Sequence, residues 1–311
     1  MEFRQLICVE AVVRHRHFTR AADELHMAQS ALSHQIGRLE RELGTPLFER
    51  TSRRVTPTEA GEVVAFRARR VMAELEATRQ EVDQLRGVLR GHIWVGALQP
   101  AGDVDVPGLL ARFSQAFPGV EVSLREGIAV EMFDHLAADE LDAAFCLLGW
   151  EPAADFAFER LSEDEAVIGM APGRAPSGEY LTVAELAGHR LIGPRRGSAI
   201  THAVGEVFAA AGQPFRLSLE SGDPFLLRAL AAQGFATAIL PRSLTALDGP
   251  ALVVRSLRPA VRLPVALVWR RNRRTSPAAQ TFIEFVRSAT SQIAARSARA
   301  RVLDFTGWEV A

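Results

Sequence analysis

Residues 29–43 follow the period of an α-helix that has one apolar face and one polar face. The apolar side chains recur at steps of four, three and four residues, at Leu32, Ile36, Leu39 and Leu43, and this spacing places them in one stripe of a helix. The polar side chains near the helix start project the opposite way: Gln29, Ser30, Ser33 and His34. They donate and accept hydrogen bonds and none is acidic, so this face suits the edge of a base pair better than solvation alone.

Two shorter helices are predicted before this one and a hairpin after it. Residues 3–13 and 20–25 have helical apolar spacing, and Thr19 is the expected N-cap of the second helix. The third helix is expected to end at Gly44, which suits the left-handed residue after a helix. The following "TPLFERTSRRVTP" predicts a small hairpin with Arg50, Arg53 and Arg54 at its tip. Such an order predicts a winged helix-turn-helix, whose second paired helix enters the DNA major groove.

A long helix is predicted next. "TPTE" at 56–59 is a helix start, with Thr56 as the cap. Apolar or small positions then alternate in steps of four and three, at Val64, Ala68, Val71, Leu75, Thr78, Val82, Leu85 and Leu89. This 3.5-residue period is typical of a coiled coil, and the alternative is a helix packed on its own domain. Two coiled chains would carry two recognition helices, so we expect a dimer that reads a DNA site of two-fold symmetry.

The rest of the chain alternates buried strands with helices. "HIWVGAL" and "LDAAFCLL" belong to a first round and "GFATAILP" to a second, as in a mainly parallel sheet covered on both faces. Crossings near residues 160 and 266 predict two α/β lobes with a ligand cleft at the strand ends. The polar groups of "PRRGSAIT", which precedes a helix, are Arg195, Ser198 and Thr201, and a helix N-terminus there can hold an anion. Gln99, Pro100 and Ile128 follow other strands of this unit.

Composition narrows the classes of function. Among 311 residues, 48% are hydrophobic and 23% charged, with a net charge of −1, so a nucleic-acid partner needs a local patch rather than a global field. Cys8 and Cys146 lie in apolar runs of different candidate domains, and free buried thiols are expected. The sequence has no apolar run of about 18 residues and no catalytic or metal-binding motif that we recognise. We therefore expect a cytoplasmic protein without membrane partner, catalytic residues, metal or cofactor.

The stretch "FTRAADELHMAQSALSHQIGRLERELGTPLFER" and the following "RRV..T.AG" closely resemble the DNA-binding segment of LysR-type transcriptional regulators over residues 1–65. "VG", "LDAAF" and "GFATAILP" resemble the effector domain of the same family less specifically. The resemblance implies base contacts from the polar face of residues 29–34, phosphate or minor-groove contacts from the three hairpin arginines, and effector contacts at Gln99, Ile128 and Ser198.

Four positions depart from the family pattern. His34 stands where the family commonly has Arg, and Ala28 stands where a capping Ser is usual, which weakens that helix end by about 1 kcal/mol. Relatives often have Ser or Thr near positions 99 and 128, where this chain has the long Gln99 and the apolar Ile128. These residues are compatible with an effector that is larger or more apolar than a small carboxylate.

Together these patterns predict an all-α winged helix-turn-helix domain (1–57), a coiled-coil linker helix (58–90), a two-lobed α/β effector domain resembling periplasmic binding proteins (91–295) and a tail (296–311). The dimer seam is expected at Val71, Leu75, Val82 and Leu85. The expected function is sequence-specific transcriptional regulation by an effector-responsive homodimer or dimer of dimers. Its expected partners are double-stranded DNA, an unidentified small-molecule effector and itself, with RNA polymerase a further candidate. A clamshell enzyme and a DNA-binding protein without ligand are the alternatives.

Overall fold

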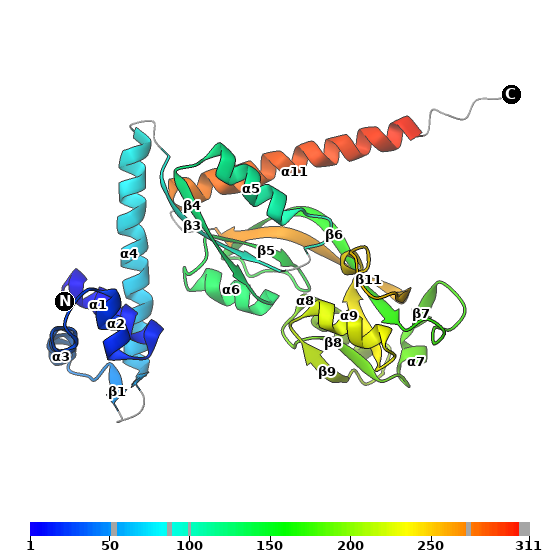
Figure 1. The fold of residues 1–311 in the computed structure, drawn as a ribbon, viewed down its shortest axis with the longest axis horizontal. Coiled ribbons are helices and arrows are strands. Elements are labelled where there is room, and N and C mark those ends of the chain that lie inside the picture. The colour runs from blue at the N-terminus through cyan, green and yellow to red at the C-terminus, as the bar shows by residue number, and fades with distance from the viewer. Residues whose placement is uncertain (51–54, 86–88, 99–100, 272–274, 305–311) are drawn as a thin grey trace. The chain divides into compact units, whose positions relative to one another are not determined.

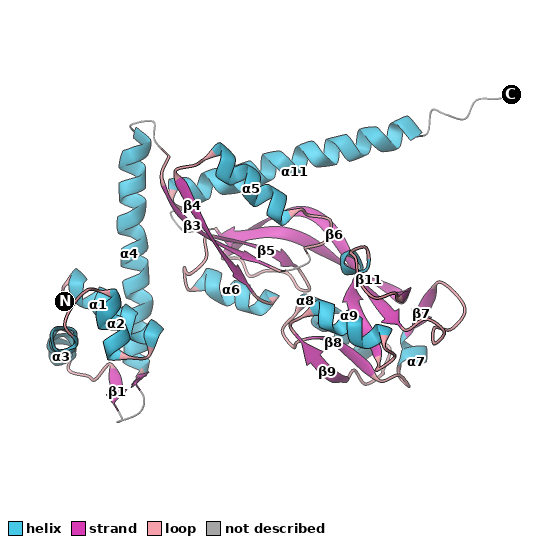
Figure 2. Ribbon diagram, in the orientation of Figure 1, coloured by secondary structure: helices cyan, strands magenta, loops and turns pink. Residues whose placement is uncertain are grey.

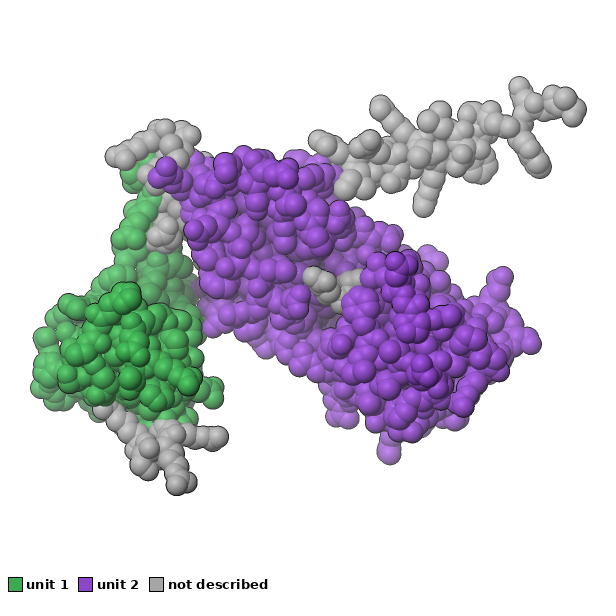
Figure 3. Space-filling model, viewed as in Figure 1, with its two compact units in different colours: residues 1–86 green, residues 87–311 purple. Residues whose placement is uncertain are grey.

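The computed structural model describes residues 1–50, 55–85, 89–98, 101–271 and 275–304 (Figure 1), without the side chains of residues 50, 76, 80, 81, 83–85 and 291–304. The chain divides into two compact units, residues 1–86 and 87–311 (Figure 3). Each unit is described by itself below.

The first unit contains three short helices, a two-stranded hairpin and a long helix. These elements are α1 (Phe3–His15), α2 (Phe18–Glu24), α3 (Gln29–Leu43), β1 (Phe48–Arg50), β2 (Val55–Pro57) and α4 (Glu59–Leu85). The predicted stripe of α3 is confirmed at Leu32, Ile36 and Leu39, which are fully buried in the core, whereas Leu43 is 42% exposed at the helix end. Gly44 has the expected left-handed conformation, with φ of 70°.

Two predicted helix starts are wrong. The backbone N–H groups of Thr19 and Arg20 donate to the ring Nδ1 of His17, at 3.2 and 3.4 Å, so His17 rather than Thr19 caps α2. Helix α4 begins at Glu59 and not after Thr56, because residues 55–57 pair with β1 as strand β2. The hydroxyl of Thr58 accepts from the N–H of Gly61 at 3.1 Å and serves as the cap.

The first turns of α4 pack on the core of their own unit. Ala65 and Ala68 are fully buried, and Val64 packs against the same core, so the alternative of a helix packed on its domain holds for these turns. Further along the helix, the apolar side chains of the predicted seam are exposed: Val71 by 41%, Leu75 by 44% and Val82 by 46%. The seam position Leu85 lies outside the described side chains. Among the described side chains of α4, an exposed apolar stripe therefore begins at Val71.

Gly61 provides a test of this packing. A Cβ at Gly61 would lie 2.0 Å from the carbonyl oxygen of Leu47, a backbone atom with little freedom to move, whereas a Cβ at Gly37 in α3 meets nothing within 4 Å. We expect Gly61→Ala to destabilise the unit by about 1–3 kcal/mol, the range for overpacking. Gly37→Ala should stabilise it by up to about 1 kcal/mol through helix propensity. Urea unfolding followed by circular dichroism checks both, and equal stability of the two variants would contradict the packing.

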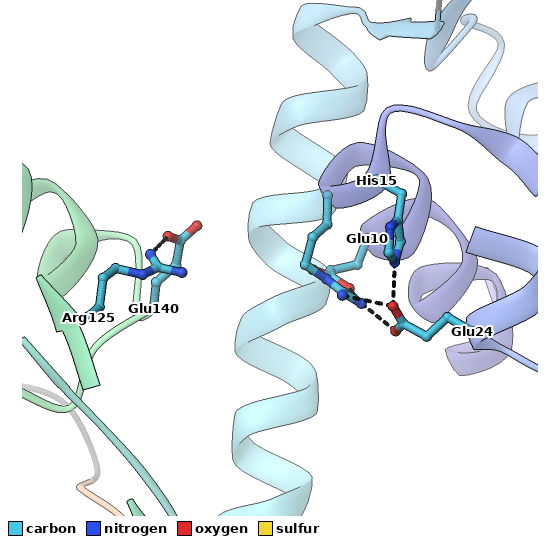
Figure 4. Close-up of polar contacts among 6 residues, drawn as sticks. Glu10, His15, Glu24, Arg125 and Glu140 are labelled. Atoms are coloured by element: carbon cyan, nitrogen blue, oxygen red, sulfur yellow. Dashed lines mark hydrogen bonds and ion pairs between the residues drawn. The ribbon is translucent and has the colours of Figure 1, made fainter. Parts of the chain in front are cut away.

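A cluster of charged side chains joins α1 to α2 (Figure 4). Arg14 contacts Glu24 with Nη1 at 2.9 Å and Glu10 with Nε at 3.1 Å, and His15 also contacts Glu24. Hydrogen bonds from Arg14 and then from His15 lower the pKa of the Glu24 carboxyl to about 2. The ionised carboxylate of Glu24 therefore forms an ion-paired link between α1 and α2.

The lowered pKa gives an acid dependence of stability with a definite sign. Because the carboxyl of Glu24 titrates lower in the folded chain than its ordinary 4.5, its contribution is fully present above that pH and lost as the pH falls toward 2. Glu24→Gln should thus lower stability at neutral pH by at most about 1 kcal/mol, as for other exposed ion pairs, and the difference should vanish in acid. Glu49→Gln, at an exposed carboxyl of β1, is the control. Thermal unfolding across this pH range checks the expectation, and a difference that persists at low pH would contradict it.

The second unit is one mixed sheet covered by helices (Figure 2). Its strands are β3 (Gly91–Ala97), β4 (Val120–Glu126), β5 (Ala143–Leu147), β6 (Phe156–Met170), β7 (Tyr180–Thr182), β8 (Leu191–Pro194), β9 (Leu217–Ser221), β10 (Thr237–Pro241) and β11 (Val253–Arg270). Its helices are α5 (Val106–Ala116), α6 (Ala129–Ala137), α7 (Val183–Leu186), α8 (Ala199–Ala210), α9 (Pro224–Ala232), α10 (Arg242–Thr245) and α11 (Pro277–Asp304).

The sheet order β4-β3-β5-β11-β6-β10-β8-β9 divides the unit into two lobes. Strands β3, β4 and β5 with α5 and α6 form lobe 1, and β8, β9 and β10 with α8 and α9 form lobe 2. The long antiparallel strands β6 and β11 pair with each other and run through both lobes, because β11 pairs with β5 of lobe 1 at Val265–Val268 and β6 pairs with β10 of lobe 2 at Ala166–Gly169. The predicted crossings near residues 160 and 266 are therefore confirmed.

Helices α5 and α11 cover one face of lobe 1 and α6 covers the other. Phe113 of α5 meets Phe282 of α11 edge to face, with centroids 5.0 Å apart, and Phe145 of β5 completes the cluster. On the α6 face, Arg125 of β4 donates to Glu140 at 2.9 Å (Figure 4). The lobe is thus held on both faces of its strands, which fixes the strand ends that border the cavity described below.

Candidate functional site

The polar face of α3 is open to solvent. Gln29, Ser30 and His34 are exposed and Ser33 is half-buried, all within the first two turns of the helix. The N-cap of α3 is Ala28, which has no capping side chain, so the first backbone N–H groups of this helix are not met by a side chain of the cap. The structure therefore gathers all four predicted base-contacting residues at one accessible helix end.

A hydrogen bond ties the hairpin that follows α3 to this helix, and another closes the base of the hairpin. The N–H of Leu47 donates to Glu40 Oε1 at 2.8 Å, and the Thr58 hydroxyl donates to the carbonyl of Pro46 at 2.8 Å. Strands β1 and β2 pair from Phe48 with Pro57 to Arg50 with Val55. Arg50 ends β1 with an undescribed side chain, and Arg53 and Arg54 lie outside the described residues. The predicted wing is present, and its arginines stay predictions.

A cavity of about 480 Å³ lies between the two lobes of the second unit. Lobe 1 contributes strand ends and the residues after them: Ala97, Leu98, Glu126, Gly127, Ile128 and Leu147. Lobe 2 contributes Pro194, Arg195, Ser198, Ala199, Ile200, residues 221–225, Leu227 and Pro241. Its size and largely apolar lining with a few polar groups are typical of a small-molecule site.

The predicted effector residues fall into three groups. Ile128, Arg195 and Ser198 line the cavity, Thr201 does not, and Gln99 and Pro100 lie outside the described residues. The lining residues that sequence reasoning did not mention include Glu126 and Phe225. The position of Glu126 at the end of a strand was the available signal for it.

Ser198 is bound into the start of α8. Its Oγ accepts from the N–H of Thr201 at 3.1 Å and donates to Thr201 Oγ1 at 2.9 Å, and that hydroxyl donates to the carbonyl of Pro194 at 2.8 Å. Thr201 thus positions Ser198 from outside the cavity lining. Ala199 and Ile200 line the cavity at the first turn of α8, where backbone N–H groups have no partner within the helix and favour a negative or polar group.

The charged groups of the cavity come from both lobes. Asp223 caps α9, since its Oδ1 accepts from the N–H groups of Phe225 and Leu226 at 2.9 and 3.2 Å. Arg195 of lobe 2 lies 3.3 Å from Glu131 of α6 in lobe 1. Glu126 is exposed at the end of β4. The cavity therefore combines an apolar body with charged groups on opposite walls.

Both cysteines are free and buried. Burial raises the pKa of the Cys8 thiol, and it raises the pKa of Cys146 to about 12. A thiol with a raised pKa carries little thiolate and reacts slowly. Within the described part of the chain, no three His, Cys, Asp or Glu side chains are grouped as a metal site, and no helix is long and apolar enough to cross a membrane.

A winged helix-turn-helix followed by a two-lobed α/β unit with a central cavity defines a ligand-responsive DNA-binding regulator. Residues 3–62 match the model of the bacterial regulatory helix-turn-helix protein of the lysR family, and residues 86–291 match the LysR substrate binding domain. The chain belongs to the LysR family of bacterial transcriptional regulators.

Individual relatives agree with this assignment. The chain is 30% identical to the uncharacterized HTH-type transcriptional regulator YybE of Bacillus subtilis over 94% of this chain and all of that protein. It is 31% identical to the dual regulator OxyR of Escherichia coli over 78% of this chain and 79% of OxyR. Among solved structures, CbnR, a LysR family transcriptional regulator also solved with its target DNA, is similar with a TM-score of 0.66 at 25% identity, over 93% of this chain and 99% of CbnR.

Proposed function

We propose that this LysR-type regulator reads DNA with the exposed face of α3 and is controlled by a small molecule in the inter-lobe cavity. The cavity of about 480 Å³ at the strand ends carries this proposal, because a regulator that only bound DNA would have no use for it. Gln29, Ser30, Ser33 and His34 are the proposed base-contacting residues, and Arg50, Arg53 and Arg54 the proposed phosphate contacts. Ile128, Arg195 and Ser198 are the proposed effector contacts, together with Gln99 and Pro100, and with Thr201 as a positioning residue.

We propose that the chain acts as a homodimer through α4, with domain limits at 57, 90 and 295. The exposed stripe of Val71, Leu75 and Val82 supports the dimer, because these apolar side chains are accessible along one side of a long helix. Leu85 extends the stripe in the sequence. A dimer presents two copies of α3 to DNA and suits an operator of two-fold symmetry. Assembly of dimers into a tetramer and contact with RNA polymerase belong to the same proposal.

An effector-binding role suits the cavity better than catalysis does. Its described lining contains no His or Cys, and the Ser198 hydroxyl donates to Thr201 rather than to a general base. Relatives include hydrogen peroxide-inducible genes activators. In this chain the two thiols are buried and lie in different units, so we propose that it responds to a bound ligand rather than to thiol oxidation, and needs no cofactor.

A ligand screen with a cavity variant tests this function. A bound effector raises the unfolding temperature of the chain, and we expect the effector found in this way to change the mobility of the chain's complex with its operator. Ser198→Ala should lose most of this response while its operator affinity stays near that of the unchanged protein. Asp105→Ala, which removes the cap of α5 outside the cavity lining, is the matched control. An effector that acts equally on both variants would place its site elsewhere.

A further inference from the structure

Two polar contacts join the lobes beside the cavity, both between α6 of lobe 1 and the loop before α8 of lobe 2. Arg195 Nη1 lies 3.3 Å from Glu131 Oε1, and Nη2 lies 3.5 Å from Oε2. The backbone N–H of Val130 donates to the carbonyl of Gly197 at 3.3 Å. We call these four residues the inter-lobe latch. It links two segments far apart in the sequence across the cleft in which the effector is proposed to bind.

The local backbone holds Glu131 in place for this contact. Its Oε2 accepts from the N–H of Ile128 at 3.0 Å, so the carboxylate is fixed at the start of α6. Gly197 has φ of 85°, and a Cβ there would lie 2.7 Å from Val130 Cγ1. A glycine at this position is therefore what allows the two segments to approach.

Arg195 belongs to the latch and to the cavity wall at once. It lines the cavity, and a Cβ at Gly222 would lie 2.9 Å from its Nε, so the glycine leaves room for the guanidinium along that wall. Arg195 is the cationic side chain among the described lining residues, and the first turn of α8 lies beside it. An anionic group of a ligand is drawn to this wall, where it meets an arginine already paired with Glu131.

We propose that Glu131 determines effector specificity as a tethered competitor for Arg195: an anionic effector binds at the expense of the Glu131–Arg195 ion pair and thereby releases the latch. This inference rests on the proposed function, in which the effector occupies the cavity. The pair is half-exposed, at 47% and 38% for the two side chains, so breaking it costs little. Because the ligand replaces Glu131 only when the latch opens, it binds the latched and released arrangements of the lobes unequally, as a ligand-driven switch requires.

A pair of probes that differ only in charge tests the competition. 3-Phenylpropanoate and 2-phenylethylamine share a phenylethyl body that suits the apolar lining and carry opposite charges. Each is titrated calorimetrically into the full-length protein and into Glu131→Gln, Glu131→Gln with Arg195→Gln, and Glu206→Gln. The amide of Glu131→Gln keeps an oxygen that accepts from the N–H of Ile128. Glu206 is an exposed carboxyl of α8 outside the cavity lining, so Glu206→Gln is the matched control.

We expect Glu131→Gln to bind the carboxylate about two- to fivefold more tightly than the unchanged protein, the range that an ion pair of this exposure accounts for. The gain should disappear in the double variant, Glu206→Gln should behave as the unchanged protein, and the amine should gain nothing. The inference is overturned if Glu131→Gln shows no gain or no binding of the carboxylate, or if the gain survives removal of Arg195. Operator footprints of the same preparations distinguish failure of this inference from failure of the proposed function. If the operator is protected but Glu131→Gln gains no affinity for the carboxylate, only the inference about Glu131 is wrong.

Discussion

Leu75→Glu is expected to abolish tight operator binding. Leu75 is 44% exposed in the middle of the apolar stripe of α4, and in a dimer a carboxylate at this position would be buried against its twin without a partner. Without the dimer each α3 binds its half-site alone, and the loss of the linkage lowers operator affinity by at least about 100-fold. Sedimentation should show a smaller oligomer, and gel shift should show the loss of affinity.

Val63→Glu is the matched control for this prediction. Val63 is 55% exposed on the same helix and lies about 120° around the axis from Leu75, at 3.6 residues per turn. The same charge placed there should leave the oligomer and the operator affinity unchanged. An intact oligomer in Leu75→Glu would place the main interface in the α/β unit instead.

Gln29→Ala is expected to remove about 1–3 kcal/mol of discrimination at one base pair in each half-site. Gln29 is the first residue of α3 and is exposed, so its amide is free to meet a base edge in the major groove. Affinity for unrelated duplex DNA should hardly change. Binding to operators that differ at single base pairs measures the effect, and equal loss on every sequence would contradict a base contact.

The wing arginines supply the contrasting pattern. Replacement of Arg53 and Arg54 by Ala should weaken binding to all sequences and reduce its dependence on salt, because phosphate contacts release counterions without reading sequence. A loss of affinity for only one DNA sequence would indicate that these arginines contact bases rather than phosphates. The pair of experiments thus separates the two roles proposed for the first unit.

Short-range patterns in the sequence predict many of the helices and strands of the fold. The stripe of Leu32, Ile36 and Leu39 predicted α3 because its burial follows the helical period. The cap of α2 was missed because His17 acts through a ring nitrogen, which is uncommon at this position. The start of α4 was predicted too early because pairing with β1 draws Thr56 into a strand, and such pairing depends on the tertiary fold.

The cavity could be predicted only in outline. The order of strands indicates a cleft between two lobes. Arg195 and Ser198 were candidates for its lining because their loop follows the end of a strand, and both line the cavity. The sequence did not reveal the full length of β6, because three consecutive charged residues at 163–165 are atypical of a central strand. The structure accommodates Asp164 there because its buried carboxylate accepts hydrogen bonds from the N–H and hydroxyl of Ser243. The contact of Arg195 with Glu131 joins residues 64 positions apart, and no local pattern announces such a pair.

Selection of binding sites from random duplex DNA by the full-length protein tests the central claim most directly. The account predicts one enriched sequence made of two half-sites in two-fold relation, with centres separated by about 10 base pairs or a multiple of that helical repeat. Gln29→Ala should select a sequence relaxed at one position of each half-site. Recovery of no enriched sequence, or of a single half-site without its symmetric copy, would contradict a dimeric regulator that reads DNA through α3.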